Sequence, residues 1–257
     1  MNSTWTDEYL TRIGAARPAS PDLDSLRELQ LAHLYAVPFE NLSIHLGEPI
    51  VLDRDALVDK VVERRRGGFC YELNGAFAAL LTELGYRVSM LSARVYGADG
   101  RASVPFDHLT LRVDLDEPWL VDVGFGAFAS RPLGMSYRGD QPGPDGMFRI
   151  EESAGELDVI GDGKPNYRID QRAYELADFG PTCWWQQTWP DSHFRRSLVC
   201  SVLTRSGRVT LSGDRLTVTD GGERTESTLS SDAEILAAYR THFGIDLDRV
   251  PRVAPSA

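Results

Sequence analysis

The sequence predicts an α+β fold whose three parts follow one another along the chain. Apolar residues recur at helical spacing over roughly the first 85 residues. The pattern then changes to short alternating runs of polar and apolar residues, separated by glycine-containing turns. One more helical pattern follows near the end of the chain. Because no repeat or low-complexity linker separates these parts, we expect subdomains packed around a shared site.

Each predicted helix has start or stop signals. The predicted helices lie at residues 5–13, 23–35, 53–62 and 70–84. Asp22 or Asp24 can cap the second helix and Asp53 the third, because short polar side chains accept hydrogen bonds from first-turn N–H groups. Gly85 is a typical stop signal for the fourth. The segment Pro38–His45 is predicted as a loop or irregular turn.

The β-type patterns predict a small antiparallel sheet or barrel in the middle of the chain. The predicted strands lie at residues 88–96, 106–113 and 119–123, with hairpins over 147–169 and further short strands at 198–203, 208–211, 215–218 and 225–229. A last helix is predicted over residues 231–243, with acidic residues in its first turn.

Composition narrows the class of protein. Of 257 residues, 42% are hydrophobic and 25% charged, which is ordinary for a globular protein. The net charge of −11 disfavours nucleic acid and anionic membranes as partners. No apolar run approaches the ~20 residues that cross a bilayer, and no signal peptide pattern begins the chain, so we expect a cytoplasmic protein. Three cysteines without CxxC spacing (Cys70, Cys183 and Cys200) indicate neither a disulfide framework nor a metal site.

The stretch RRRGGFCYELNG places Cys70 where a glycine turn becomes a helix. Gly67 and Gly68 permit backbone angles closed to other residues. At a helix start, unsatisfied N–H groups and the helix dipole favour the thiolate, which is the nucleophilic form of cysteine. The alternative is a buried cysteine acting as a small hydrophobe. Beside it, Arg64–Arg66 is either an anion-binding cluster or a solvated helix end.

A cysteine nucleophile needs a base and a group that orients the base. Of five histidines, only His108 lies in a strand pattern, next to a strand with an acidic residue, Asp122. A carboxylate among apolar neighbours is costly unless it is paired. If the two strands are adjacent, Asp122 can hold His108 and His108 can face Cys70. The alternative is a His–Asp pair with a structural role only.

These motifs, in this order, resemble the arylamine N-acetyltransferase family. The resemblance covers nearly the whole chain, and its most specific motifs are RGGFCYELNG and LVDVGFG; the others are VPFENLSI, LGY, ARVYG, FDHLTL, PDSHF and FGIDL. It implies a cysteine-protease-like core with Cys70 as nucleophile, His108 as base and acid, and Asp122 as orienting acid. It also implies a helical bundle over residues 1–85, a β-barrel over 86–190 and an α/β lid over 191–257.

The resemblance further implies acetyl-CoA as co-substrate, a small aromatic amine or hydrazine as acceptor, no permanently bound cofactor and ping-pong kinetics. The GFGAFAS loop is similar to the family's loop near the CoA pyrophosphate, which assigns the donor site to Gly124, Phe125, Gly126 and Ser130. The acceptor pocket is assigned to Phe39, Val95 and Phe125. Glu40, Asn41, Glu72 and Asn74 either support the reacting residues or are purely structural, and the structural interpretation is preferred for all four. A homodimer is one of the assemblies that the sequence leaves open.

Two segments depart from the family pattern. QQTWP, preceded by Trp184 and Trp185, replaces the Ser-Thr-His-Pro run of many relatives, and the loop before His108 is short. Both features fall where donor or acceptor is expected. The runner-up function is therefore an amide synthase that releases a polyketide acyl chain from an acyl carrier protein as a macrolactam. A papain- or transglutaminase-like hydrolase and a noncatalytic binding module are the alternatives from other classes.

Overall fold

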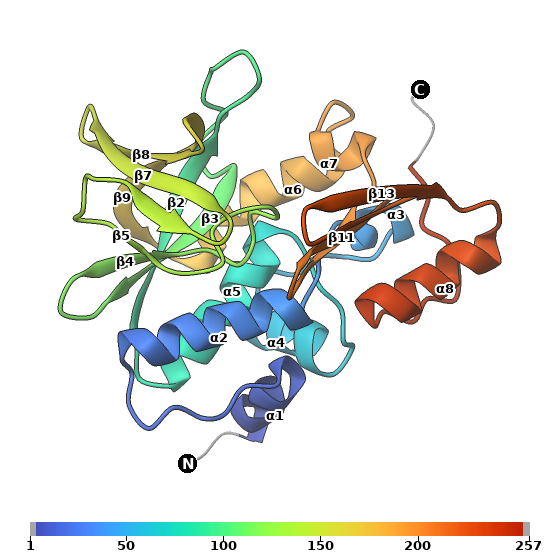
Figure 1. Cartoon of the computed structure of the whole chain (residues 1–257), viewed down its shortest axis with the longest axis horizontal. Coiled ribbons are helices and arrows are strands. Elements are labelled where there is room, and N and C mark those ends of the chain that lie inside the picture. Colours follow the sequence, from blue (N-terminus) through green and yellow to red (C-terminus); the bar gives the residue numbers. More distant parts are fainter. Residues whose placement is uncertain (1–3, 254–257) are drawn as a thin grey trace.

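A computed structural model of the chain describes residues 4–253 (Figure 1). Its α-helices are α1 (Thr4–Ile13), α2 (Leu23–Ala36), α3 (Leu42–Leu46), α4 (Arg54–Val62), α5 (Cys70–Glu83), α6 (Gly180–Thr188), α7 (His193–Arg196) and α8 (Asp232–Phe243). A short 3₁₀ helix, η1 (Leu176–Phe179), precedes α6. The caps follow the sequence: Asp22 Oδ1 accepts a hydrogen bond from Ser25 N at 2.9 Å, and Asp53 caps α4.

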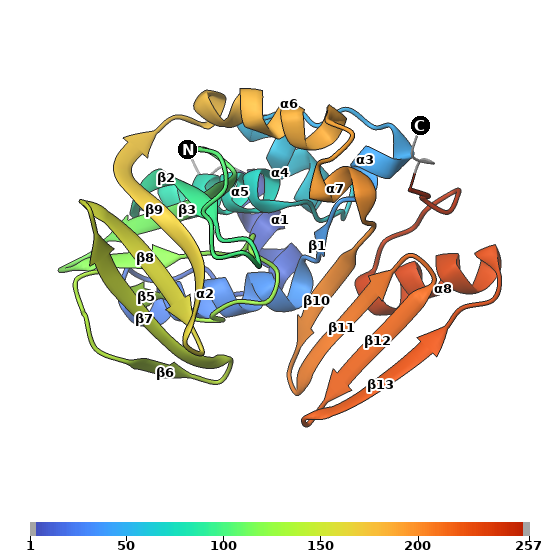
Figure 2. The same cartoon turned by 90° about the horizontal axis from the view of Figure 1, so that it is seen from above.

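The strands form two antiparallel sheets. They are β1 (Phe39–Glu40), β2 (Arg87–Val95), β3 (His108–Asp114), β4 (Pro118–Val121), β5 (Leu133–Gly134), β6 (Gln141–Gly143), β7 (Gly146–Ser153), β8 (Glu156–Gly161), β9 (Lys164–Tyr174), β10 (Cys200–Thr204), β11 (Gly207–Ser212), β12 (Arg215–Asp220) and β13 (Glu223–Thr228). The larger sheet has the order β5-β4-β3-β2-β9-β8-β7-β6 and curls into a nearly closed barrel (Figure 2). The smaller has the order β1-β10-β11-β12-β13.

Three hydrophobic cores hold these elements together. One surrounds α5 and joins the N-terminal helices to β3 and β4, a second fills the barrel, and a third lies between the smaller sheet and α8. The helix α5 is buried along most of its length, with Leu73 and Phe77 fully enclosed. Because close-packed interiors restrict movement, α5 holds its first residue, Cys70, in a fixed place.

Three features differ from the sequence prediction. The segment Pro38–His45 is not a loop, because Phe39 and Glu40 pair with Ser201 and Cys200 of β10 and the chain then forms α3. This strand pairs with a segment about 160 residues away, so local periodicity does not reveal it. The helices α6 and α7 were also absent from the prediction. Asp122 lies directly after β4 and not inside it.

The division into residues 1–85, 86–190 and 191–257 stays a prediction, and its ends at residues 1–3 and 254–257 lie outside the described residues. Over residues 4–253, no helix combines the length and the apolar character that a membrane span requires.

Candidate active site

Cys70 is the first residue of α5 and is only 3% exposed. The turn that leads into the helix is held by Glu72, whose Oε2 accepts a hydrogen bond from Phe69 N at 3.3 Å. The other carboxylate oxygen of Glu72 accepts from Lys60 Nζ at 2.5 Å, in a buried ion pair. The helix start is therefore fixed by a charge pair from α4 as well as by its own backbone.

The two glycines before Cys70 are required for space, not for unusual backbone angles as the sequence suggested. Neither Gly67 nor Gly68 has a positive φ. A Cβ on Gly67 would lie 1.8 Å from the Pro38 carbonyl oxygen, and one on Gly68 would lie 2.6 Å from Glu72 Oε2. These close approaches let the turn pack under β1, which explains the Gly-Gly pair before the nucleophile.

The neighbouring arginines do not form a free anion site. Arg66 is buried and pairs with Glu40 and Glu48, and Arg64 reaches Glu48 at 3.4 Å. Both interpretations of Arg64–Arg66 are therefore wrong for Arg66, because it stabilises the structure under β1 and α3.

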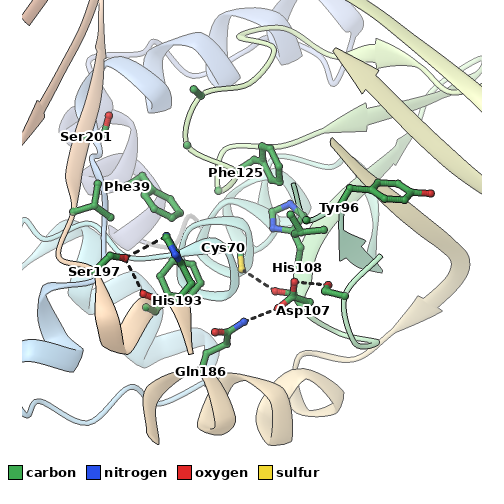
Figure 3. A pocket seen from close by; sticks show the side chains of 18 of the residues that line it. Phe39, Cys70, Tyr96, Asp107, His108, Phe125, Gln186, His193, Ser197 and Ser201 are labelled. Atoms are coloured by element: carbon green, nitrogen blue, oxygen red, sulfur yellow. Dashed lines mark hydrogen bonds between the residues drawn. The ribbon is translucent and has the colours of Figure 1, made fainter. Parts of the chain in front are cut away.

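The strands β3 and β4 are adjacent, as the sequence argument required. His108 begins β3, Asp122 follows β4, and His108 Nε2 lies 2.6 Å from Asp122 Oδ2. The other ring nitrogen, Nδ1, is left for Cys70, with whose thiol the imidazole interacts. The structure thus brings the three predicted residues together at the junction of α5 and the barrel, and Figure 3 shows Cys70 and His108 side by side at the cavity.

Four donors converge on the Asp122 carboxylate. Besides His108, Tyr167 Oη donates to Oδ2 at 3.0 Å, while Asn74 Nδ2 and Gly124 N each donate to Oδ1 at 2.9 Å. Burial raises the pKa of Asp122, but the imidazole of His108 and these hydrogen bonds outweigh burial and lower it. Asp122 therefore stays ionised although it is buried.

Sequence reasoning missed two of these four donors. It interpreted Asn74 as structural, yet the Asn74 side chain contacts Asp122, donates to the Leu109 carbonyl and accepts from Val123 N. Tyr167 lies on β9, about 45 residues after Asp122, and had no local signal. Asn74 falls one turn after Cys70 on the same helix, and that spacing was the one available clue.

The protonation of Cys70 differs from the expectation of a helix-start thiolate. Burial raises the pKa of the thiol, and the opposing influence of His108 is smaller. Burial lowers the pKa of His108, but the Asp122 carboxylate outweighs burial and raises it to about 10. Cys70 and His108 shift each other's pKa, so they titrate as a pair. Because the imidazole has the high proton affinity, the form suited to nucleophilic attack is the one in which the pair holds a single proton on His108 and Cys70 is the thiolate.

A cavity of about 1390 Å³ opens over Cys70 and His108. Its apolar wall comes from β1, β2, the 124–127 loop, α6, α7 and the chain after α7, with Phe39, Val95, Phe125, Trp185, Phe194 and Leu198. The predicted residues Gly124 and Gly126 also line it, but Ser130 does not. The Ser130 hydroxyl and N–H donate to Asp145 Oδ2, and Ser130 lines a second cavity of about 620 Å³.

The 124–128 loop is close to Cys70, and three of its backbone N–H groups have no partner within the protein. A Cβ on Gly124 would lie 2.7 Å from Cys70 Cα, so only glycine fits there. Within residues 4–253, the N–H groups of Phe125, Gly126 and Ala127 have no hydrogen-bond acceptor. Arg208 of β11 lines both cavities, as Ala127 does; it donates to Ser201 Oγ at 3.1 Å and forms no ion pair among the described residues, although Asp145 is near enough to interact with its charge. This combination favours an anionic ligand.

The chain was compared with known proteins. A family model described as N-acetyltransferase matches residues 22–252. Arylamine N-acetyltransferase of Mycolicibacterium smegmatis is 36% identical, with 93% of this chain and 91% of the relative covered. The Escherichia coli (strain K12) enzyme of the same name is 33% identical, with 94% and 89% covered.

Solved structures agree with this relationship. Arylamine N-acetyltransferase from Salmonella typhimurium superposes with a TM-score of 0.90 at 30% identity, over 100% of this chain and 96% of the other. The Mycobacterium marinum enzyme, solved in complex with CoA, has a TM-score of 0.85 at 32% identity, over 93% and 92%. The expected α+β fold with a cysteine-protease-like core is confirmed. The chain belongs to the arylamine N-acetyltransferase family.

Proposed function

We propose that this protein transfers an acetyl group from acetyl-CoA, through a thioester on Cys70, to the nitrogen of an arylamine or arylhydrazine. The observation behind this proposal is that Cys70 and His108 line a large, mostly apolar cavity, with His108 hydrogen-bonded to the buried Asp122 and its imidazole interacting with the Cys70 thiol. The names of the relatives and the CoA bound to the Mycobacterium marinum enzyme support the same reaction.

In the first half-reaction, His108 Nδ1 accepts the proton of the Cys70 thiol. The Sγ thiolate then attacks the thioester carbonyl carbon, and first-turn N–H groups of α5 face the developing oxyanion. When the tetrahedral species collapses, the bond from the acyl carbon to the CoA sulfur breaks. His108 returns its proton to that sulfur, which leaves an acetyl group on Cys70.

In the second half-reaction, the amine nitrogen attacks the acetyl-Cys70 carbonyl and His108 accepts the amine proton. The Cys70–acyl bond breaks, Sγ regains a proton from His108, and the amide leaves. Asp122 stays ionised and holds the imidazole in the required tautomer throughout. Because CoA departs before the amine reacts, the kinetics are ping-pong.

The donor's phosphates are assigned to the wall that holds the free N–H groups. Phe125 and Gly126 offer free backbone N–H groups there, and Gly124 permits close approach because it has no side chain. Arg208 adds a positive charge from β11. Ser130 acts indirectly in this assignment, because it ties the end of the loop to Asp145. The acceptor lies against Phe39, Val95 and Phe125, whose apolar surfaces suit a flat aromatic ring.

The test is to incubate the protein with acetyl-CoA, with longer acyl-CoAs and with an acyl carrier thioester, and to record the mass of Cys70-containing peptides. We expect an acetyl adduct on Cys70 that disappears when an arylamine is added, with amide formed in equal amount. Acylation by the carrier thioester alone would contradict acetyl-CoA as donor, and hydrolysis without an adduct would favour a hydrolase. The carrier-protein partner, a homodimer and a cytoplasmic location stay predictions from the sequence.

A further inference from the structure

The short segment before His108 is held in a strained conformation. Phe106 has a φ of +63°, in the left-handed region that bulky residues avoid. Such a backbone persists only when its surroundings over-determine it. Here Phe106 N donates to Ser92 Oγ at 2.9 Å, and the Phe106 carbonyl accepts from Tyr71 Oη at 2.8 Å. Phe106, two residues before the proposed base, is therefore held in place by tertiary contacts.

Asp107, between Phe106 and His108, is fixed at three points. Its carbonyl accepts from Tyr71 Oη at 3.0 Å and lies 4.0 Å from Cys70 Sγ. Ser103 Oγ donates to Asp107 Oδ2 at 2.5 Å, and Gln186 Nε2 donates to Oδ1 at 2.5 Å (Figure 3). Among the described residues Asp107 has no Lys, Arg or His partner, so two neutral donors hold this carboxylate.

Of the two donors to the Asp107 carboxylate, Ser103 is a near neighbour in sequence, whereas Gln186 comes from a distant part of the chain. It lies on α6, is 5% exposed, and its Oε1 accepts from Ser192 Oγ at 2.7 Å. That bond determines which way the amide points, so that Nε2 faces Asp107. The next residue, Gln187, points elsewhere and donates to Cys183 of its own helix.

We propose that Gln186 is a positioning residue that holds His108 against Cys70 through Asp107. The proposal deepens the proposed function, on which its activity readout rests. It assigns a role to the QQTWP segment, which the sequence singled out and could not explain. Without the Gln186 amide, one oxygen of the half-buried Asp107 carboxylate loses its donor, and the segment that contains the strained Phe106 can relax together with His108. A displacement of about 1 Å at a reacting group costs up to about 100-fold in rate.

The experiment compares Gln186→Leu with Gln187→Leu, a neighbouring change of the same type on the same helix. For Gln186→Leu we expect kcat to fall by about 10- to 100-fold while KM for acetyl-CoA stays within about twofold. Gln187→Leu should match the wild type. Equal rates for wild type and Gln186→Leu, or equal losses in the two variants, would overturn the proposal.

A second readout does not depend on acyl transfer. The titratable groups that face Cys70 are His108, Asp107 and Tyr71, and of these His108 lowers the thiol pKa. If His108 moves away in Gln186→Leu, the pH midpoint of iodoacetamide labelling of Cys70 shifts upward; an unchanged midpoint contradicts the proposal. If wild-type Cys70 takes no acetyl group but the midpoint shifts as stated, the proposed function fails and the positioning role stands.

Two further variants keep the test decisive if Gln186→Leu folds poorly. Gln186→Glu places a second carboxylate against Asp107, so its activity relative to wild type should recover as the pH falls from about 8 to about 6 and a shared proton restores the bond. In an Asp107→Ala background, which lacks the acceptor oxygens, Gln186→Leu should cause no further loss, because the two residues act as a unit. Additive losses in that cycle would refute a role through Asp107.

Discussion

The polar groups on two walls of the cavity differ in whether they have hydrogen-bond partners within the protein. On the wall of the proposed triad, every oxygen of Asp122 has two donors, and His108 and Cys70 are both nearly inaccessible to solvent. On the adjoining wall, formed by the 125–127 loop beside His108 and by Arg208 of β11, the N–H groups of Phe125 to Ala127 have no acceptor and Arg208 forms no ion pair among the described residues.

This difference indicates which wall is complete by itself. Buried polar groups without partners are costly, so a satisfied network preorganises the reacting groups, whereas an unsatisfied one has capacity for a ligand. We therefore expect changes on the triad wall to impair transfer from any acyl donor. Changes to the 125–127 loop or to Arg208 should impair only donors that bear phosphate.

The largest expected effect follows from Asp122→Asn. Asparagine keeps the shape but removes the charge that stabilises the imidazolium and fixes its tautomer, so kcat should fall by about 10³- to 10⁴-fold. The loss should be the same with acetyl-CoA and with S-acetylpantetheine, which has no phosphate. The exposed Asp140→Asn serves as control. Turnover near the wild-type rate in Asp122→Asn would contradict its orienting role.

Arg208→Leu tests whether Arg208 contacts the phosphate of the acyl donor. Loss of a charge-assisted contact to phosphate should raise KM for acetyl-CoA by about 10- to 100-fold and leave kcat/KM for S-acetylpantetheine unchanged. Arg215→Leu, an exposed arginine paired with Glu226, should have no effect on either donor. If Arg208→Leu lowers kcat/KM equally for acetyl-CoA and S-acetylpantetheine, Arg208 does not act through the phosphate of the donor.

Tyr167→Phe removes one of the four donors to Asp122 and leaves the ring in place. We expect a decrease in kcat of about tenfold and a loss of about 1–3 kcal/mol in the free energy of unfolding, because a buried carboxylate loses a hydrogen bond. Urea denaturation and steady-state kinetics measure both. An unchanged kcat would mean that His108, Asn74 and Gly124 suffice to hold Asp122.

The smallest effect concerns pH. The pKa of His108 is raised to about 10 in the folded protein, above its value in an unfolded chain. Protonated His108 therefore stabilises the fold fully below about pH 6.5, and this contribution disappears as the pH rises to about 10. The Tm of wild type should fall over that window. His108→Gln should show a shallower fall, and an identical pH dependence would contradict a raised pKa.

The sequence predicts best those features whose interacting residues are close together along the chain. Helix α5, with Cys70 at its start, is predicted well because its apolar spacing and stop signal are local. The pairing of β3 with β4 can also be predicted from the sequence, since a short turn connects the two strands. In contrast, β1 pairs with β10 across most of the chain, and Gln186 reaches Asp107 from a helix that the periodicity did not predict.

The sequence by itself determined the family, the α+β class and the identity of the residues proposed to react, since rare residues in specific motifs mark them. Only the tertiary structure decided how these residues are supported. Asn74 and Tyr167 meet at Asp122, and Arg208 faces the glycine loop, because strand register and helix packing bring distant segments together. It also decided the protonation of Cys70: a helix start favours the thiolate, but burial, which depends on the whole fold, outweighs that preference.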